Sequence, residues 1–282
     1  MGCKQMQSQQ WSAFYPSSQS ANINTLSHPM QAQNFDLNRY LQRIGYAGPA
    51  HADINTVRSL MRHQLRSVPF ENLDVQAGKV VSLVPEDIVN KIVGGPRGGY
   101  CYEVNGLFAM ALQALGVPYQ FVAARPMFYP VRRPKTHMAL VVTLDGTPWL
   151  CDLGFGSWGI REPMRLDQSG QEVQQDCDTF KLTQTGDNHL LQARSGGEWL
   201  NQYEFNLAEQ EWIDFAPANY LNSTHPDAIF VQKHLVILHT PHGRKMLVGD
   251  VFKLIEDGQV QQQTVSPDGV ADLLAHEFGL CG

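Results

Sequence analysis

The sequence of 282 residues has no long apolar run and no long basic run. No window approaches the roughly 20 consecutive apolar residues of a membrane-spanning helix, and the N-terminus has no apolar core resembling a secretion signal. The net charge is −6 at pH 7, and no cluster of Lys and Arg gives the basic surface of a nucleic-acid-binding protein. We therefore expect a cytoplasmic protein that binds neither nucleic acid nor membranes.

Disulfide and metal-binding patterns are also missing. The five cysteines are odd in number and widely spaced, and no two of them form C-x-x-C. This is not a disulfide framework or a zinc-binding pattern. The ten histidines are scattered without an H-E-x-x-H motif, so we expect no metal ion.

The chain divides by composition into a tail, a helical part and a strand-rich part. Residues 1–33 are rich in Gln, Ser and Asn, which is typical of disorder. Helical spacing of apolar residues runs through 34–117, short β-rich segments follow in 118–210, and 211–282 holds a connecting helix and a mixed terminal unit. Helices followed by antiparallel strands indicate an α+β fold rather than alternating α/β.

Capping residues mark the bounds of three expected helices. Asp53 is suited to cap a helix that starts at Ile54. Pro85 fits the first turn of a short helix. Gly116 is expected to close the helix that begins after the turn PRGG.

The helix after PRGG supplies the first candidate for chemistry. Cys101, Val104, Phe108, Ala111 and Leu115 recur every three or four residues and are expected to share one apolar face. A thiol at the first turn meets unpaired backbone N–H groups and the positive end of the helix dipole, which favour thiolate. The preceding glycines would let the backbone approach a ligand, and the N–H groups could hold an oxyanion. An inert buried cysteine is the competing interpretation.

A hairpin supplies the second candidate. Asp145–Gly146 is a strong signal for a two-residue turn, which would place Leu144 opposite Thr147. The same register places Ala139 opposite Asp152.

In that register His137 and Asp152 are diagonal neighbours on one face, within reach of a hydrogen bond. Cys151 must point to the other face, into the core, and Gly154 opposite His137 would leave the imidazole open on one side. Together with Cys101, these residues fit a nucleophile, a base and an orienting carboxylate. A strand-end histidine beside an unrelated turn aspartate is the alternative, and the pattern does not separate a hydrolase from a transferase.

The sequence resembles the arylamine N-acetyltransferases. The matching motifs occur in that family's order: VPFENLD at 68–74, RGGYCYE at 97–103, THMALVV at 136–142, CDLGFG at 151–156 and LNSTHPDAIF at 221–230. The resemblance implies a papain-like Cys-His-Asp site, with Cys101, His137 and Asp152 as the catalytic triad. It also implies a helical bundle over 34–117, an antiparallel β-barrel over 118–210 and, after the connecting helix, an α/β lid within 211–282.

The resemblance further implies a substrate pocket beside the thiol. It is formed by Phe70, Tyr102, Val122, Thr136, Phe155, Gly156 and Phe230. By the residues alone, Phe70, Tyr102, Val122 and Phe230 could equally belong to the core. Glu71, Asn72 and Arg97 match family positions that buttress the site, and Ala228 stands where a serine is common.

The implied activity is a two-step transfer. Acetyl-CoA, the co-substrate, would acetylate Cys101, and the acetyl group would then pass to the nitrogen of an arylamine. Hydrazines and the oxygen of N-hydroxyarylamines are further expected acceptors. Three alternatives stay open: a relative that closes an amide in a polyketide, a thiol hydrolase, and a binding protein without catalysis. The sequence does not indicate an oligomeric state.

Overall fold

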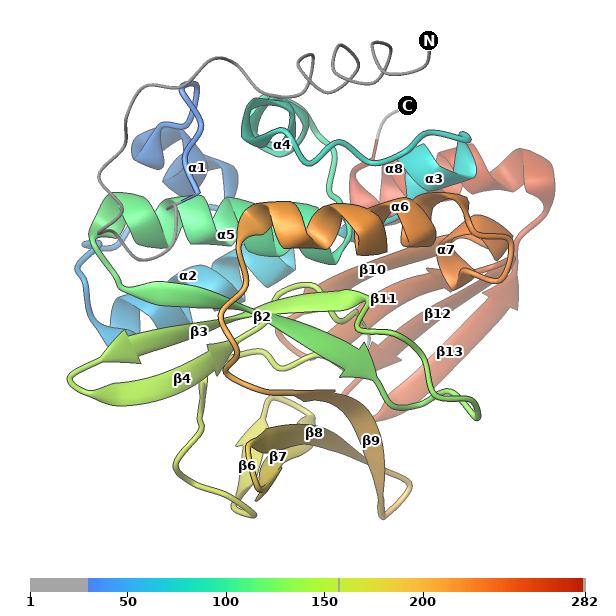
Figure 1. Ribbon diagram of the computed structural model, residues 1–282. Helices are drawn as coiled ribbons and strands as arrows, with labels where there is room; N and C mark the ends of the chain where they lie inside the picture. Colours follow the sequence, from blue (N-terminus) through green and yellow to red (C-terminus); the bar gives the residue numbers. More distant parts are fainter. Residues whose placement is uncertain (1–29, 157, 281–282) are drawn as a thin grey trace, which may run out of the picture.

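The computed structural model describes residues 30–156 and 158–280, and a helical part comes first in the chain (Figure 1). The helical part holds α1 (Leu37–Arg43), α2 (Ile54–Ser67), α3 (Leu73–Gln76), α4 (Pro85–Ile92) and α5 (Cys101–Leu115), with the short strand β1 (Phe70–Glu71) among them. All three predicted helix bounds are confirmed. Asp53 accepts a hydrogen bond from Thr56 N at 2.7 Å, Pro85 is the first residue of α4, and Gly116 closes α5 at φ 71°.

The predicted tail falls mostly outside the described residues, but its last part is packed on the body. Met30 is buried and its amide donates to the Tyr119 hydroxyl at 2.9 Å. The Gln33 amide donates to Glu86 Oε1 at 2.9 Å. The prediction of disorder is therefore wrong for residues 30–33, because local composition did not reveal these long-range contacts.

Eight antiparallel strands form one curled sheet. They are β2 (Tyr119–Pro126), β3 (His137–Leu144), β4 (Thr147–Cys151), β5 (Met164–Arg165), β6 (Glu172–Gln175), β7 (Asp178–Thr185), β8 (Asn188–Ser195) and β9 (Glu198–Phe205). The order is β5-β4-β3-β2-β9-β8-β7-β6, so β5 and β6 form the two edges. The expected barrel is thus an open half-barrel within the described part of the chain.

The C-terminal part begins with the expected connecting helix and ends in a second sheet. Its elements are the 3₁₀ turn Trp212–Phe215, α6 (Ala216–Thr224), α7 (Ile229–Gln232), β10 (Leu235–Thr240), β11 (Gly243–Val248), β12 (Val251–Glu256), β13 (Gln259–Thr264), the turn Pro267–Gly269 and α8 (Val270–Phe278). The sheet order is β1-β10-β11-β12-β13, with Phe70 opposite Ile237. The helical part therefore contributes the edge strand of the C-terminal sheet.

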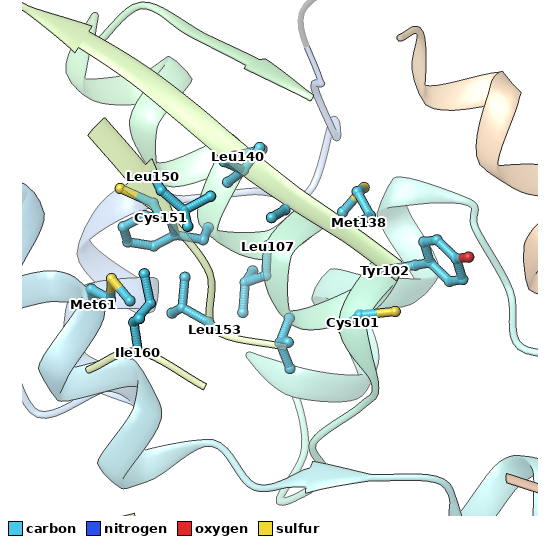
Figure 2. Packing of buried hydrophobic residues seen from close by; sticks show 14 of the residues in the cluster. Met61, Cys101, Tyr102, Leu107, Met138, Leu140, Leu150, Cys151, Leu153 and Ile160 are labelled. Carbon is cyan, nitrogen blue, oxygen red and sulfur yellow. The ribbon is translucent and has the colours of Figure 1, made fainter. Parts of the chain in front are cut away.

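Helix α5 runs through the centre of the core (Figure 2). Every residue from Cys101 to Leu112 is buried, so the predicted apolar face lies in the core and the other faces of the helix are covered as well. A side chain at Gly106 would lie 2.9 Å from both Met30 and Trp212. Full burial of each large apolar side chain contributes about 1.5–3 kcal/mol, which anchors the first turn of this helix firmly. Within residues 30–156 and 158–280, no helix has the length and apolar character needed to cross a membrane.

Candidate active site

The turn PRGG brings the start of α5 against β1. A side chain at Gly98 would lie 1.8 Å from the carbonyl oxygen of Pro69. Gly99 N donates to Pro69 O at 3.2 Å, and Glu71 N donates to Gly99 O at 3.0 Å. The glycines thus allow close approach of two backbone segments. We expected these glycines to let a ligand approach the backbone. Instead, the space beside Gly98 is filled by the backbone of residues 69–71.

The predicted hairpin register is confirmed. Leu144 lies opposite Thr147 and Leu140 opposite Cys151. His137 Nε2 lies 2.8 Å from Asp152 Oδ2, and both side chains are buried. Cys151 is fully buried in the core, as expected for the opposite face.

Asn105 ties this hairpin to the helix that carries the thiol. Its Nδ2 donates to Met138 O at 2.7 Å and to Asp152 Oδ1 at 3.1 Å, while its Oδ1 accepts from Leu153 N at 2.8 Å. Sequence reasoning missed this residue. The signal available was an amide side chain one turn after Cys101 in an otherwise apolar stretch, because a buried amide must find hydrogen-bond partners.

The electrostatics of the pair favour a charged imidazole. Burial by itself lowers the pKa of His137, but the Asp152 carboxylate and a hydrogen bond with Cys101 outweigh it and raise the pKa from 6.5 to about 10. Burial would raise the pKa of Asp152, but His137, the Gly154 amide and Asn105 hold it below its ordinary value. His137 and Asp152 are therefore both ionised at neutral pH.

Gly154 lies directly against the cysteine. A side chain at Gly154 would be 2.5 Å from Cα and 2.9 Å from Cβ of Cys101. The space left by the missing side chain is thus filled by Cys101 rather than left open beside His137, which corrects the expectation from the hairpin alone.

Two aromatic rings cover the imidazole. The ring centroids of Phe155 and Tyr203 each lie 5.0 Å from that of His137, and 4.7 Å from one another. Burial and the nearby Asp152 carboxylate raise the pKa of Tyr203 well above its ordinary value, so its hydroxyl stays neutral. Tyr203 comes from β9, far along the chain, and no motif in the sequence pointed to it.

Cys101 and His137 line a cavity of about 830 Å³ between the curled sheet, the α6–α7 segment and the C-terminal sheet. Four of the predicted pocket residues line it: Phe70, Thr136, Phe155 and Phe230. Most of the remaining wall is apolar and includes Trp158, Ile237 and Met246.

The other three predicted pocket residues do not line this cavity. Tyr102 is buried and donates its hydroxyl to Thr136 O at 2.9 Å. Val122 is fully buried within β2, opposite Ala139. Gly156 adopts φ 84°, where a side chain would meet Ile237 at 3.1 Å. Tyr102 and Val122 are buried behind the residues that line the cavity, and the space beside Gly156 is occupied by Ile237.

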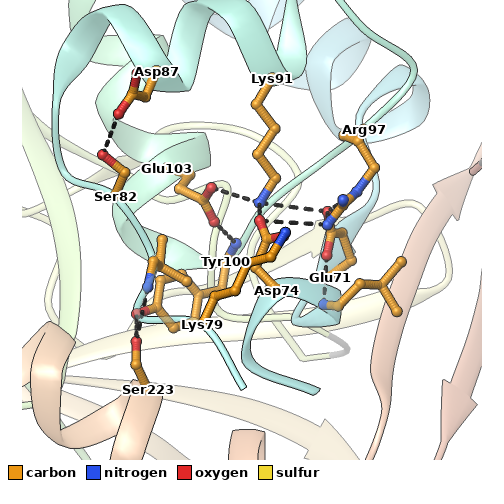
Figure 3. Close-up of polar contacts among 12 residues, drawn as sticks. Glu71, Asp74, Lys79, Ser82, Asp87, Lys91, Arg97, Tyr100, Glu103 and Ser223 are labelled. Carbon is orange, nitrogen blue, oxygen red and sulfur yellow. Dashed lines mark hydrogen bonds and ion pairs between the residues drawn. The ribbon is translucent and has the colours of Figure 1, made fainter. Parts of the chain in front are cut away.

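A charged cluster supports the start of α5 from behind (Figure 3). It consists of Glu71, Asp74, Lys91, Arg97 and Glu103. Lys91 Nζ lies 2.6 Å from Asp74 Oδ2 and 2.7 Å from Glu103 Oε1, and Arg97 Nη2 lies 2.9 Å from Glu71 Oε1. Glu103 Oε2 accepts from Tyr100 N at 3.0 Å. The cluster therefore fixes the backbone immediately before the thiol.

Glu103 of this charged cluster has a raised pKa. Burial raises its pKa from 4.5 to about 7, in spite of Lys91, and the nearby Glu71 adds to the rise. Three carboxylates share two cations in the cluster, so one carboxylate lacks a full counter-charge. The buttressing role expected for Glu71 and Arg97 thus extends to Lys91 and Glu103.

Asn72 connects the helical part to the far wall of the cavity. Its Nδ2 donates to Phe230 O at 2.7 Å and Lys233 O at 2.8 Å, and its Oδ1 accepts from Leu235 N at 2.8 Å. The position of Phe230 on the cavity wall therefore depends on an amide in the motif VPFENLD.

A second buried cluster lies behind Trp158, and sequence reasoning missed it. Asp178 pairs with two buried guanidiniums, those of Arg161 and Arg244, the latter at 2.6 Å. The Arg244 guanidinium also lies 4.6 Å from the centre of the Trp158 ring. We call these three charged residues the two-arginine cluster. Through Asp178 the cluster connects β7 with β11 and with Arg161, which follows the cavity residue Trp158 closely in the chain.

Among the residues that the structure describes, no group of three or more His, Cys, Asp or Glu is arranged to hold a metal ion. The ionised groups of the site are instead the hydrogen-bonded pair His137–Asp152, with the Cys101 thiol beside the imidazole. A thiol next to an oriented imidazole can take part in acyl transfer through a thioester.

Comparisons with known proteins agree with this arrangement. A family model described as N-acetyltransferase matches residues 53–281. Arylamine N-acetyltransferase of Escherichia coli is 33% identical over 250 residues, covering 86% of this chain and 88% of that protein. Arylamine N-acetyltransferase / N-hydroxyarylamine O-acetyltransferase of Salmonella typhimurium is 30% identical over 249 residues, covering 86% and 88%.

A solved structure has the same fold. Mycobacterium marinum arylamine N-acetyltransferase in complex with CoA matches with a TM-score of 0.82 at 32% identity, covering 86% of this chain and 92% of that one. Fold and sequence together define an N-acetyltransferase. More narrowly, the chain belongs to the arylamine N-acetyltransferase family.

Proposed function

We propose that this arylamine N-acetyltransferase transfers the acetyl group of acetyl-CoA through Cys101, with His137 and Asp152 completing a catalytic triad. The observation that carries the proposal is the buried His137–Asp152 hydrogen bond of 2.8 Å, beside a thiol on the cavity wall. Asp152 orients the imidazole through Nε2 and leaves Nδ1 for the thiol.

In the first step, the Cys101 thiolate attacks the carbonyl carbon of the acetyl thioester. The C–S bond to coenzyme A breaks, and the departing thiolate takes the proton that His137 carries. In the second step, the amine nitrogen attacks acetyl-Cys101, neutral His137 accepts a proton from that nitrogen, and the Cys101 thiolate leaves. Asp152 supports the positive charge on His137 whenever the imidazole is protonated.

Aromatic amines suit this cavity. Such an amine is neutral at physiological pH, so its lone pair is free to attack. Phe70, Phe155 and Phe230 line the cavity, and an aromatic pair contributes about 0.5–1.5 kcal/mol beyond the buried area. The printed name of the Salmonella relative includes O-acetylation of N-hydroxyarylamines, and we include these compounds and hydrazines among the proposed acceptors.

The test is the release of coenzyme A from acetyl-CoA with and without an arylamine such as 4-methylaniline. We expect slow release by the enzyme alone and strong acceleration by the amine, with acetylated amine formed in equal amount. Fast release that an amine does not accelerate would identify a thiol hydrolase. No release at all would identify a binding protein, and either result would overturn the proposal.

A further inference from the structure

The C-terminal sheet ends in a strand that carries no charge. β13 is the outer strand of this sheet (Figure 1), and its sequence QVQQQT contains no Asp, Glu, Lys, Arg or Pro. All of its residues are exposed, so no segment among the described residues covers it. Natural edge strands are ordinarily very short, or carry charges, proline or bulges, because these features prevent pairing with another chain.

The other three sheet edges of the described chain have such protection. β1 is two residues long and also meets Gly99 of the PRGG turn. β5 is two residues long and contains Arg165, which pairs with Asp167. β6 is four residues long and contains Glu172, which pairs with Arg194. β13 is six residues long and keeps an unbroken register against β12, so it is the exception among these edges.

The turn before β13 determines which backbone groups point outward. β13 follows β12 after a two-residue turn at 257–258, and Glu256 lies opposite Gln259. The pair next to such a turn exchanges both backbone hydrogen bonds, and bonded pairs then alternate along the two strands. The β13 residues that are bonded to β12 are therefore Gln259, Gln261 and Gln263.

The alternate residues of β13 present their backbone N–H and C=O groups at the edge. These residues are Val260, Gln262 and Thr264. A bond of 2.7 Å from Val265 N to Asp250 O agrees with this alternation, because it continues the bonded series two residues after position 263. A second β13, laid antiparallel with Gln262 opposite its own copy, has Thr264 opposite Val260. Every outward N–H and C=O group of both strands then has a partner.

We propose that β13 pairs with β13 of a second copy of this chain, antiparallel and about a two-fold axis at Gln262. A two-fold interface brings the same surface of both copies together, so a strand without charge meets no like charge. Lys253, opposite Gln262 on β12, would lie three strand spacings from its copy, roughly 14 Å. That distance exceeds the screening length of about 8 Å at physiological salt. The exposed acids Asp257 and Asp268 lie beyond the two ends of the strand.

The size of this edge predicts a weak dimer with two open cavities. A strand of this length extends about 20 Å, which gives a smaller contact than the roughly 1,200–2,000 Å² of a stable interface. We expect a Kd of about 10–100 µM, as for transient contacts. The C-terminal sheet lines the cavity from β10 and β11, for example with Ile237 and Val248, at least two strands from this edge. Pairing should therefore leave the activity per subunit unchanged.

The first experiment is sedimentation velocity from about 1 to about 200 µM protein, a range that spans the expected Kd. Wild type should shift from monomer to dimer within it. Gln262→Lys places two ammonium groups opposite one another at the axis, so it should raise the Kd at least about tenfold. Gln171→Lys makes the same charge change at an exposed loop residue, and this control should dimerise as wild type does.

The second experiment tests the register by disulfide cross-linking. In the proposed pairing, residue 262 and its copy have Cα atoms about 5.5 Å apart, within the range of a disulfide. Residue 261 is diagonal to its copy at about 7–8 Å, which is beyond that range. Under mild oxidation Gln262→Cys should form covalent dimers and Gln261→Cys should not. Both variants are made in a background with serine at three native cysteines: Cys3, Cys177 and Cys281.

Four results would overturn the proposal. Wild type could remain monomeric over the whole concentration range. Gln262→Lys could dimerise as strongly as wild type, which would place the contact elsewhere. Gln171→Lys could weaken the dimer as much as Gln262→Lys, which would show an effect of net charge alone. Gln262→Cys could cross-link no faster than Gln261→Cys, which would contradict the two-fold pairing. If Gln262→Lys does not fold, the cross-linking comparison decides.

Discussion

Nε2 of His137 lies 2.8 Å from Oδ2 of Asp152, and both side chains are buried between α5 and the β3–β4 hairpin. The other carboxylate oxygen of Asp152 accepts from Asn105 at 3.1 Å and from the Gly154 amide at 2.8 Å. The carboxylate is therefore fixed from two sides, and it in turn fixes the ring that faces Cys101. Orientation and charge at His137 depend on this one acid.

Asp152→Asn should reduce kcat/KM by on the order of a hundredfold or more. The amide keeps the shape but removes the negative charge, so only Cys101 still opposes the effect of burial and the pKa of His137 falls. Alkylation of Cys101 by iodoacetamide at pH 7 should slow in parallel. Asp167→Asn, which changes an exposed carboxylate paired with Arg165, is the control and should alter neither measurement. Unchanged rate and alkylation in Asp152→Asn would show that the carboxylate does not support the site.

Gly154→Ala should displace the thiol. The new methyl group would lie 2.5 Å from Cα of Cys101, closer than real contacts allow, so one of the two segments must move. We expect a loss of kcat/KM of at least roughly a hundredfold, since misplacement by about 1 Å has that effect. Gly146→Ala is the control: φ is 73° there and nothing lies within 4 Å. That variant should lose about 1 kcal/mol of stability and retain full activity per folded molecule.

Glu103→Gln should flatten the pH dependence of stability. The pKa of Glu103 is about 7 in the folded protein against an ordinary 4.5, so the folded state holds the proton more tightly than the unfolded state. That contribution is fully present below pH 4.5 and is lost as pH rises through 7. Between pH 4.5 and 7.5, the free energy of unfolding in urea should fall more in wild type than in Glu103→Gln, by on the order of 2–3 kcal/mol. Equal changes in the two proteins would contradict the assignment.

The two-arginine cluster should respond asymmetrically to substitution. Arg244→Met leaves Arg161 and Asp178 as a balanced pair and keeps an apolar side chain against Trp158, so the loss of stability should stay below about 1 kcal/mol. Asp178→Asn leaves two buried guanidiniums without a counter-ion and should lose about 3–5 kcal/mol. Urea unfolding midpoints at pH 7 provide the comparison. If Arg244→Met loses as much stability as Asp178→Asn, the balance of charges in this cluster does not determine its contribution to stability.

Local sequence signals predicted the elements that carry the site. The turn at Asp145–Gly146 determined the hairpin register, and parity then placed His137 and Asp152 on one face. Capping residues likewise gave the bounds of α2, α4 and α5. These features depend on neighbours a few residues apart, so a single sequence contains them.

Features that depend on distant segments were missed or misjudged. Met30 is ordered through Tyr119, 89 residues away, and Asp178 pairs with Arg244, 66 residues away. The spacing within helix α5 showed only one apolar face, whereas Gly106 makes room for Met30 and Trp212, which come from distant parts of the chain. Tyr102 and Val122 do not line the cavity, and the sequence could not show this, because a residue buried in the core and a residue on a cavity wall have the same local pattern.

The most direct test of the account is mass spectrometry of the protein after brief exposure to acetyl-CoA without an amine. We predict one added acetyl group, located on the peptide that contains Cys101, and its disappearance when an arylamine is added. Cys101→Ser should remain folded, acquire no acetyl group and transfer none. An acetyl group on Cys151 or Cys177, or full activity in Cys101→Ser, would contradict the assignment of Cys101 as the nucleophile.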